Sequence, residues 1–211
     1  MNKRIHPAWI AAGVTFLTLV ANAGFRSAPS VLIIPLQDAF GWSRADISLA
    51  VSVNVLLFGL TAPFAAALME RFGIRRVVMC AEAVVGLGAL ATIYIQKPWH
   101  LVALWGVVVG IGTGSMALVF AATVANRWFI KRKGLVIGGL TAASATGQLI
   151  FLPGLSWLAV HHGWKSVSLV VGSASLIMVP IIFLFLKESP KHIGHTPYGA
   201  DLSYEHPSIL K

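Results

Sequence analysis

Charged residues and cysteines are scarce in this chain. Only 11% of its 211 residues are charged and only seven are Asp or Glu, whereas 57% are hydrophobic. A soluble domain normally has about a quarter of its residues charged, so this composition excludes an ordinary water-soluble domain. Cys80 is the single cysteine, which excludes an intrachain disulfide and leaves no sign of an oxidising compartment.

The chain also lacks the usual motifs of enzymes and cofactor sites. No glycine-rich phosphate loop ends in GK[ST], and no cluster of ligating residues indicates a metal site. Ser115, together with His161 and His162, is the obvious candidate for intramembrane serine hydrolysis. The serine lacks a G-x-S-x-G context, and the histidines fall in an outer loop. We therefore expect no enzyme activity, no cofactor and no metal.

What the chain does contain is long apolar stretches. A helix needs about 20 apolar residues to cross the hydrocarbon core of a bilayer, and six stretches with short connections reach that length. Strands of a membrane barrel would be about half as long and would alternate in polarity. The sequence therefore predicts an all-α membrane domain with six transmembrane helices. The predicted spans are about 7–33, 46–69, 76–95, 99–124, 134–160 and 165–186.

Two of these stretches have informative beginnings. MNKRIH and the later Ala21-Asn22-Ala23 could form a secretory signal with a cleavage site. Five more apolar stretches follow, and the first one continues through SAPSVLII, so a retained membrane helix fits better. Before the second stretch, Ser43 and Asp46 form an S-x-x-D capping pattern. The second helix should therefore begin near Arg44.

The basic residues are distributed unevenly between the connections. Lys and Arg together number 16 and give a net charge of +9. The poorer side has Arg44, Lys97 and Lys165, with Arg26 inside or at the end of the first stretch. The positive-inside rule places the richer side, with both termini, in the cytoplasm. We expect no nucleic-acid partner, because the charges lie in short loops without a separate binding domain. The richer side holds Lys3, Arg4, Arg71, Arg75, Arg76, Arg127, Lys131, Arg132, Lys133, Lys187, Lys191 and Lys211.

A weak internal repeat relates the two halves of the domain. LMERFGIRRV, which starts at Leu68, and LAVHHGWKSV, which starts at Leu158, share Leu, Gly, a basic residue and Val at a constant offset. The two segments fall on opposite sides of the membrane, as a 3+3 inverted repeat requires.

Polar side chains line one face of the first stretch. The spacing of Thr15, Thr18, Asn22 and Arg26 places them on a single side of a helix. A polar stripe in a membrane helix should face protein or water. Thr141, Ser144 and Gln148 form a shorter stripe on the fifth stretch, and Asn54 on the second could join them. We expect a water-filled cavity between these helices.

Arg26 and Glu82 are the ionised residues within apolar stretches. The Arg26 guanidinium could donate two hydrogen bonds to a carboxylate or phosphate, or it could extend to the outer membrane surface. Glu82 lies too near the cytoplasmic end of its helix to meet Arg26, so we expect it to pair with an arginine of the neighbouring loop rather than to relay protons.

The loop between the second and third stretches reads ALMERFGIRR, and it resembles the G-x-L-a-D-R-x-G-r-r signature of the major facilitator superfamily. The sequence departs from that signature at Ala66, Glu70 and Ile74. In the family this loop is a gating latch that closes against the other half of a carrier on the cytoplasmic side. The gating residues that the resemblance implies are Leu68, Glu70, Arg71, Gly73, Arg75 and Arg76.

Three further segments resemble the bacterial monocarboxylate and oxalate/formate-type branch of that family: PLQDAFGWSRADIS, NRWFIKRKGLVIGG and KESPKHIGHTPYGA. The stretch GFRSAPSVLIIPLQDAF aligns Arg26 with a basic residue that meets the substrate carboxylate in monocarboxylate carriers. The resemblance thus implies substrate binding by Arg26, to which we add Asn22, Asn54 and Gln148 as candidates. The antiporter signature GPxxGG is not evident in ATGQLIFLPGL.

Members of the family have about twelve helices in two halves, so the resemblance implies that residues 1–186 are the N-terminal six-helix half and 187–211 begin the central cytoplasmic linker. We expect a carrier for small organic anions, particularly monocarboxylates, in a bacterial inner membrane. It would work by alternating access, with a proton or counter-anion, and with a second six-helix half or a second copy of the chain. The alternative is a non-transporting remnant or a membrane assembly partner.

Overall fold

The computed structural model describes residues 6–116 and 118–200, and six of its helical spans are long and apolar enough to cross a membrane. The predicted all-α membrane domain is therefore confirmed. The spans are α1 (Pro7–Phe40), α2 (Arg44–Phe72), α3 (Ile74–Ala91) with η1 (Thr92–Tyr94), a composite fourth span, α7 (Lys133–His162) and α8 (Trp164–Phe185). The fourth span consists of α4 (Pro98–Leu101), η2 (Val102–Val109), α5 (Gly110–Gly114) and α6 (Leu118–Trp128), and a short helix η3 (Pro190–Ile193) follows α8.

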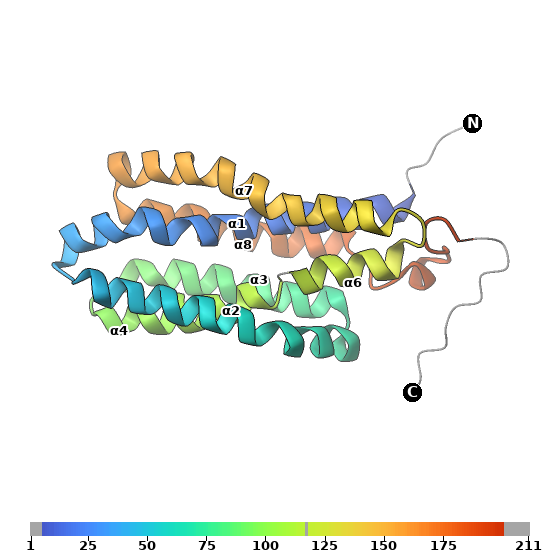
Figure 1. Cartoon of the computed structure of the whole chain (residues 1–211), viewed down its shortest axis with the longest axis horizontal. Coiled ribbons are helices and arrows are strands. Elements are labelled where there is room, and N and C mark those ends of the chain that lie inside the picture. The colour runs from blue at the N-terminus through green and yellow to red at the C-terminus, as the bar shows by residue number, and fades with distance from the viewer. Residues whose placement is uncertain (1–5, 117, 201–211) are drawn as a thin grey trace.

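Successive spans run in opposite directions along one long bundle (Figure 1). One end, which we call the basic end, holds the α2–α3 and α6–α7 loops and the end of α8. The start of α1 lies there too, because the rings of His6 and Tyr198 are 5.5 Å apart. The opposite end, which we call the far end, holds the α1–α2, η1–α4 and α7–α8 connections (Figure 1).

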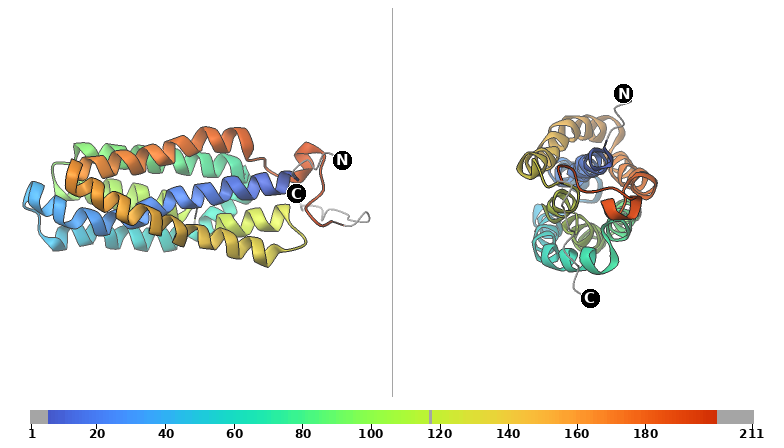
Figure 2. Two further views of the ribbon diagram at one scale, coloured as in Figure 1. Left: turned by 90° about the horizontal axis from the view of Figure 1, so that it is seen from above. Right: turned by 90° about the vertical axis from the view of Figure 1, so that its right-hand side faces the viewer.

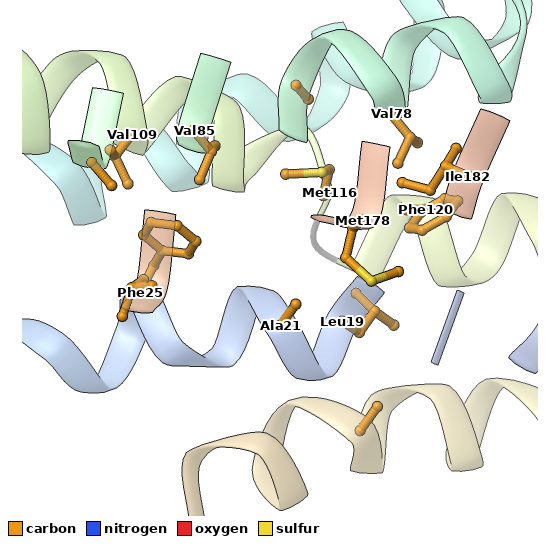
Figure 3. Packing of buried hydrophobic residues seen from close by; sticks show 14 of the residues in the cluster. Leu19, Ala21, Phe25, Val78, Val85, Val109, Met116, Phe120, Met178 and Ile182 are labelled. Carbon is orange, nitrogen blue, oxygen red and sulfur yellow. The ribbon is translucent and has the colours of Figure 1, made fainter. Parts of the chain in front are cut away.

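Helix α1 is enclosed by the bundle, whereas α2 and α7 are not. It packs along α7 and α8, while α3 packs against α8 and α2 against the fourth span, as the end-on view shows (Figure 2). In the most apolar 18-residue stretch of each span, 61% of α1 is buried, against 11% of α2 and 22% of α7. Leu19, Met116 and Met178 gather in the core beside α1 (Figure 3). Helices α2 and α7 therefore present apolar faces outward.

Two glycines make the sharp turns of the proposed repeat. Gly73 ends α2 and begins α3 with φ +92°, and Gly163 ends α7 and begins α8 with φ +79°. Residues other than glycine rarely adopt a positive φ. The two glycines occupy matching positions of LMERFGIRRV and LAVHHGWKSV, at opposite ends of the bundle.

The predicted helix boundaries hold at some places and fail at others. The Ser43–Asp46 capping box is present and α2 begins at Arg44, as predicted. Helix α1 continues beyond its predicted end to Phe40, where Gly41, with φ +68°, donates its N–H to the Gln37 carbonyl at 2.8 Å. The fourth span is not one continuous α-helix, because eight of its residues form the π-helix η2 and a turn follows α5.

Candidate functional site

Two adjoining cavities open beside the polar face of α1. One, of about 340 Å³, lies between α1, the α5–α6 region and α7, and Asn22 and Arg26 line it together with Thr141. The other, of about 490 Å³, is lined by Arg26, Asn54 and Gln148. The four residues that we expected to bind substrate thus border the two cavities, and Arg26 borders both.

Arg26 carries an uncompensated positive charge at this site. Its side chain is exposed, and its guanidinium carbon lies 5.0 Å from the centre of the Phe58 ring on α2. Among the described residues, no carboxylate lies within ion-pair distance of the guanidinium. A cation stacked on an aromatic face keeps its edge free for hydrogen bonding. The arginine is therefore available to an anion in either cavity.

The polar stripe of α1 divides into two parts. Thr15 and Thr18 are fully buried, and their hydroxyls donate to the carbonyls of Ala11 and Val14 at 2.8 Å. These bonds satisfy the two threonines within their own helix, so they do not serve the cavities. Asn22 and Arg26, farther along the stripe, are the members that reach the cavity wall.

Asn54 has a structural task as well as a place in the cavity wall. Its side-chain amide donates to the Trp105 carbonyl of η2 at 2.7 Å. The backbone of Gly110 is closely apposed, since a Cβ there would lie 3.1 Å from the Asn54 carbonyl. Asn54 therefore fastens α2 to the irregular part of the fourth span, where a π-helix leaves the regular hydrogen-bond pattern.

Glu82 does not pair with an arginine, and that expectation is wrong. The residue is fully buried in α3, and its carboxyl group contacts two neutral side chains. Asn22 donates to Oε1 at 2.6 Å, and the Ser175 hydroxyl on α8 is hydrogen-bonded to Oε2. Ser175 is not among the site residues predicted from the sequence. A serine three residues after Gly172 on a packed helix face was the available signal, and it does not specify a partner.

At the basic end, four residues of the expected gating loop line a groove of about 800 Å³, and Leu68 and Glu70 lie outside that lining. The four are Arg71, Gly73, Arg75 and Arg76. Glu70, Arg71 and Arg76 are exposed, as is 43% of Leu68, while Arg75 lies 4.3 Å from the Phe183 ring centre on α8. The sequence does not indicate which other segments of this chain meet the loop.

Glu188 and Arg127 are those neighbours of the loop. A Cβ on Gly73 would come within 2.5 Å of the Glu188 carboxyl group. The Arg127 guanidinium donates to the Met69 carbonyl at 3.4 Å. The segment after α8 and the end of α6 thus both contact the α2–α3 loop.

The segment after α8 returns to the start of α1. The Tyr198 N–H donates to the Trp128 carbonyl at 2.8 Å, and the Tyr198 carbonyl accepts from Ile130 at 2.9 Å. The His6 ring contacts the rings of Tyr198 and His195. His6 caps α1 by accepting the Ala8 N–H on Nδ1 at 3.2 Å. Burial, and then the positive charge of His195, lower the pKa of His6 below its usual value.

The residues of the hydrolase alternative belong to separate parts of the bundle. The Ser115 hydroxyl donates to the Ile111 carbonyl at 2.9 Å in the turn after α5. The His161 Nδ1 lies 2.8 Å from the Trp157 carbonyl in the last turn of α7, at the far end. Neither contact joins a nucleophile to a base.

Comparison with known proteins matches this chain with a single family of membrane proteins. The model of the Major Facilitator Superfamily matches residues 14–205. An uncharacterized MFS-type transporter of Bacillus subtilis, YcxA, is 26% identical over 183 residues, which are 86% of this chain and 45% of that protein. Human monocarboxylate transporter 7 is 30% identical over 175 residues, or 81% of this chain and 32% of the transporter.

A solved structure shares the fold. The proton:xylose symporter XylE superposes with a TM-score of 0.76 over 89% of this chain and 46% of its own, at 14% identity. This chain therefore spans less than half the length of these relatives.

Proposed function

Since the chain belongs to the major facilitator superfamily, we propose that its six helices form one half of a secondary carrier for small organic anions, and specifically monocarboxylates. Transport would proceed by alternating access, in which the six helices rock against a partner half around the cavities beside α1. The proposal makes Arg26 the anion-binding residue, with Asn22, Asn54 and Gln148 around it.

The observation that carries the proposal is the environment of Arg26. A guanidinium inside a membrane span is costly unless it has a partner or a function. Arg26 has Phe58 against its face, and no carboxylate within ion-pair distance in the described parts of the chain. A substrate carboxylate would supply the missing charge through bidentate hydrogen bonds.

The walls of the cavities favour an anion with a small apolar body. Leu19, Ala23 and Met116 line the smaller cavity, and Phe58 borders both. The larger cavity also has Ser30, Ser48 and Ser52 in its wall, which could hydrogen-bond a small polar group of the substrate. A single cation at the site suits one carboxylate better than two. The similarity to a monocarboxylate transporter supports the same substrate class.

The proposal places the protein in a bacterial inner membrane with its basic end in the cytoplasm. Leu56 and Phe64 of α2 are 61% and 69% exposed, and Leu149 of α7 is 78% exposed. These outward apolar faces fit a second six-helix half, or a second copy of the chain, across the cavities. The loop from Leu68 to Arg76 would then bias the two conformations by closing against that partner.

A non-transporting role is the second candidate. The chain covers 45% of YcxA and 32% of monocarboxylate transporter 7. A non-transporting remnant or an assembly partner could have the same six helices and the same coverage. An adjacent reading frame that encodes six more helices would favour the carrier. Its absence, together with a reconstituted chain that takes up no anion, would favour the remnant.

Uptake measurements test the carrier directly. The chain is expressed from its own locus together with any neighbouring reading frame, and uptake of labelled L-lactate, pyruvate and benzoate is followed in membrane vesicles. We expect Arg26→Ala to abolish saturable uptake and Arg26→Lys to weaken affinity, because lysine keeps the charge and loses the bidentate geometry.

Arg44→Ala is the matched control, since Arg44 is an exposed arginine at the far end and borders neither cavity. It should leave uptake unchanged. Undiminished uptake and affinity in Arg26→Ala would refute the binding role of that residue. Wild-type vesicles that take up none of the three anions would contradict the proposed substrate class.

A further inference from the structure

A buried polar cluster adjoins the anion cavity, and two of its three members, Glu82 and Ser175, have no part in the function proposed above. It joins three helices, with Asn22 on α1, Glu82 on α3 and Ser175 on α8. Glu82 and Ser175 have no exposed surface, and Asn22 is 8% exposed. A carboxyl group in such a place needs either a compensating cation or a proton.

The charged groups on the surrounding helices do not supply that cation. Every hydrogen bond to the Glu82 carboxyl within the described chain comes from a neutral side chain. Arg26 lies one helical turn beyond Asn22 and faces the cavities. The other ionisable groups of the packed elements stand toward the ends of their helices or on exposed surface. They are Asp38 on α1, Arg44, Asp46, Glu70 and Arg71 on α2, Arg75, Arg76 and Cys80 on α3, Tyr94 on η1, Arg127 on α6 and Lys165 on α8.

The hydrogen bonds at Ser175 indicate which oxygen of the Glu82 carboxyl group carries a proton. The Ser175 Oγ lies 2.9 Å from the Glu82 backbone carbonyl and also within hydrogen-bonding distance of Oε2. A serine hydroxyl has one hydrogen, and a carbonyl oxygen only accepts. Both contacts are complete hydrogen bonds if Ser175 donates to the carbonyl and the Glu82 carboxylic acid donates from Oε2 to Ser175.

The bonds at Asn22 agree with the same assignment. One amide hydrogen is donated to Glu82 Oε1 at 2.6 Å and the other to the Thr18 carbonyl at 3.0 Å. In the neutral carboxylic acid, Oε2–H then donates to Ser175 and Oε1 accepts from Asn22. The remaining polar atom, Asn22 Oδ1, is buried without a hydrogen-bond partner, and its residue lines the cavity that Arg26 borders.

We propose that Glu82 is a proton-binding site of the carrier, and that Asn22 links this site to the cavity in which Arg26 binds the anion. The inference rests on the proposed function and adds a coupling ion to it. In the described conformation Glu82 is the neutral acid. When α1 shifts relative to α3 and α8, Asn22 withdraws and cavity water reaches the carboxyl group. The Oε2–H bond then breaks, the proton passes to that water as hydronium, and a carboxylate remains.

This arrangement couples one proton to one anion by charge balance. With the anion absent and Glu82 ionised, the opposite charges of Arg26 and Glu82 compensate each other across Asn22. With the anion bound to Arg26, an ionised Glu82 would leave a net negative charge in the membrane interior, which is unfavourable. Binding of the anion therefore favours binding of the proton, and each promotes the other to the same extent.

Infrared spectroscopy of the chain in lipid nanodiscs tests the proton site without any transport. With saturating L-lactate present, we expect the carbonyl stretching band of a non-ionised carboxyl group at neutral pH, and its loss in Glu82→Gln. Ser175→Ala should move the band to higher frequency, because the acid loses the acceptor of its hydrogen. Glu188→Gln, a substitution at the basic end, is the matched control and should leave the band in place.

If Glu82→Gln fails to fold, ¹³C-labelled glutamate in the wild type shows whether the band belongs to one of the four glutamates, because the label lowers the frequency of a glutamic acid and not of an aspartic acid. The shift of the labelled band in Ser175→Ala then identifies Glu82, whose carboxyl group contacts Ser175. Absence of the band from wild type in saturating L-lactate would overturn the proposal, since Glu82 would then be ionised with the anion present. Persistence of the band in a folded Glu82→Gln protein would overturn it as well.

Transport tests the coupling separately. In vesicles with an acidic exterior, we expect the wild-type carrier to accumulate the transported anion. Glu82→Gln should lose accumulation driven by the pH gradient while it retains exchange of anion for anion. Retained pH-driven accumulation would refute the coupling. A wild type that transports no anion would refute the proposed function and the coupling, whereas the infrared band would still decide whether Glu82 holds a proton.

Discussion

Arg26 and Glu82 are both ionisable residues within apolar spans, yet their surroundings in the structure are opposite. Arg26 is exposed to two cavities and has an aromatic ring beside it. Glu82 has no exposed surface and is held by side chains from two other helices. The role of a charge in a membrane span therefore depends on its partners more than on its depth along the helix.

The two residues also differ in what the fold gains from them. The Glu82 hydrogen bonds tie α1, α3 and α8 together, so its side chain contributes to stability. The Arg26 contacts leave its hydrogen-bond donors free, so its side chain contributes to recognition. Substitutions that affect stability and uptake in opposite ways can therefore test the comparison.

The largest effect on stability is expected at Glu82. Glu82→Ala should lower the free energy of unfolding by about 2–4 kcal/mol, because it leaves a cavity and removes the partners of Asn22 and Ser175. Glu82→Gln should cost about 1 kcal/mol, since its amide can donate to Ser175 and accept from Asn22 as the neutral acid does.

Unfolding by heat in detergent micelles, followed by tryptophan fluorescence, would measure both variants. Ser144→Ala is a suitable control, because Ser144 borders the cavity outside the Glu82 cluster. If Gln were as damaging as Ala, the fold would require an ionised Glu82, and the hydrogen-bond assignment at Ser175 would be wrong.

A smaller effect on stability is expected at Arg26. Arg26→Leu should change the free energy of unfolding by no more than about 0.5 kcal/mol, because the arginine is exposed and its removal leaves no buried group without a partner. The same variant should lose anion uptake. Parallel measurements of unfolding and uptake would reveal this separation, and a strongly destabilised Arg26→Leu would show that both intramembrane charges are structural.

Much of this molecule follows from its sequence. Apolar length predicted the six spans, and the Ser43–Asp46 capping box predicted the start of α2. These features depend on neighbours along the chain, for which local propensity and hydropathy are sufficient. The signature around Gly73 predicted the family. Its glycine can also be understood locally, because the turn between α2 and α3 has a positive φ at this residue.

The contacts that determine the site did not follow from the sequence. Glu82 meets Asn22 and Ser175 because α1 and α8 both approach α3, and no periodicity along a single helix contains that arrangement. The stacking of Phe58 on Arg26 similarly depends on how α2 crosses α1. The π-helix η2 is also invisible in VALWGVVV, whose residues suit an ordinary membrane helix.

The smallest expected effect concerns His6, an ionisable residue that lies outside the spans, unlike Arg26 and Glu82. In the folded chain its Nδ1 accepts the Ala8 N–H, so the imidazole must be unprotonated at that nitrogen. Burial and His195 lower the pKa of His6 below the value of 6.5 for a free histidine. The unfolded chain thus binds a proton at a higher pH than the folded chain does. The stability that this group contributes is complete above about pH 6.5 and is lost as the pH falls through that value.

The effect of His6 is measured in Glu82→Gln protein, because a Glu82 carboxyl group that is neutral in the folded chain and ionised in the unfolded chain would itself change stability with pH. Thermal unfolding of this variant at about pH 7.5 and about pH 5.5 should show a small loss of stability at the lower pH. Addition of His6→Asn should diminish that loss, since asparagine caps a helix N-terminus equally well and does not titrate. If the double variant kept the full loss, the titrating group would not be His6, and the contrast between a proton held in the core and one exchanged at the basic end would fail.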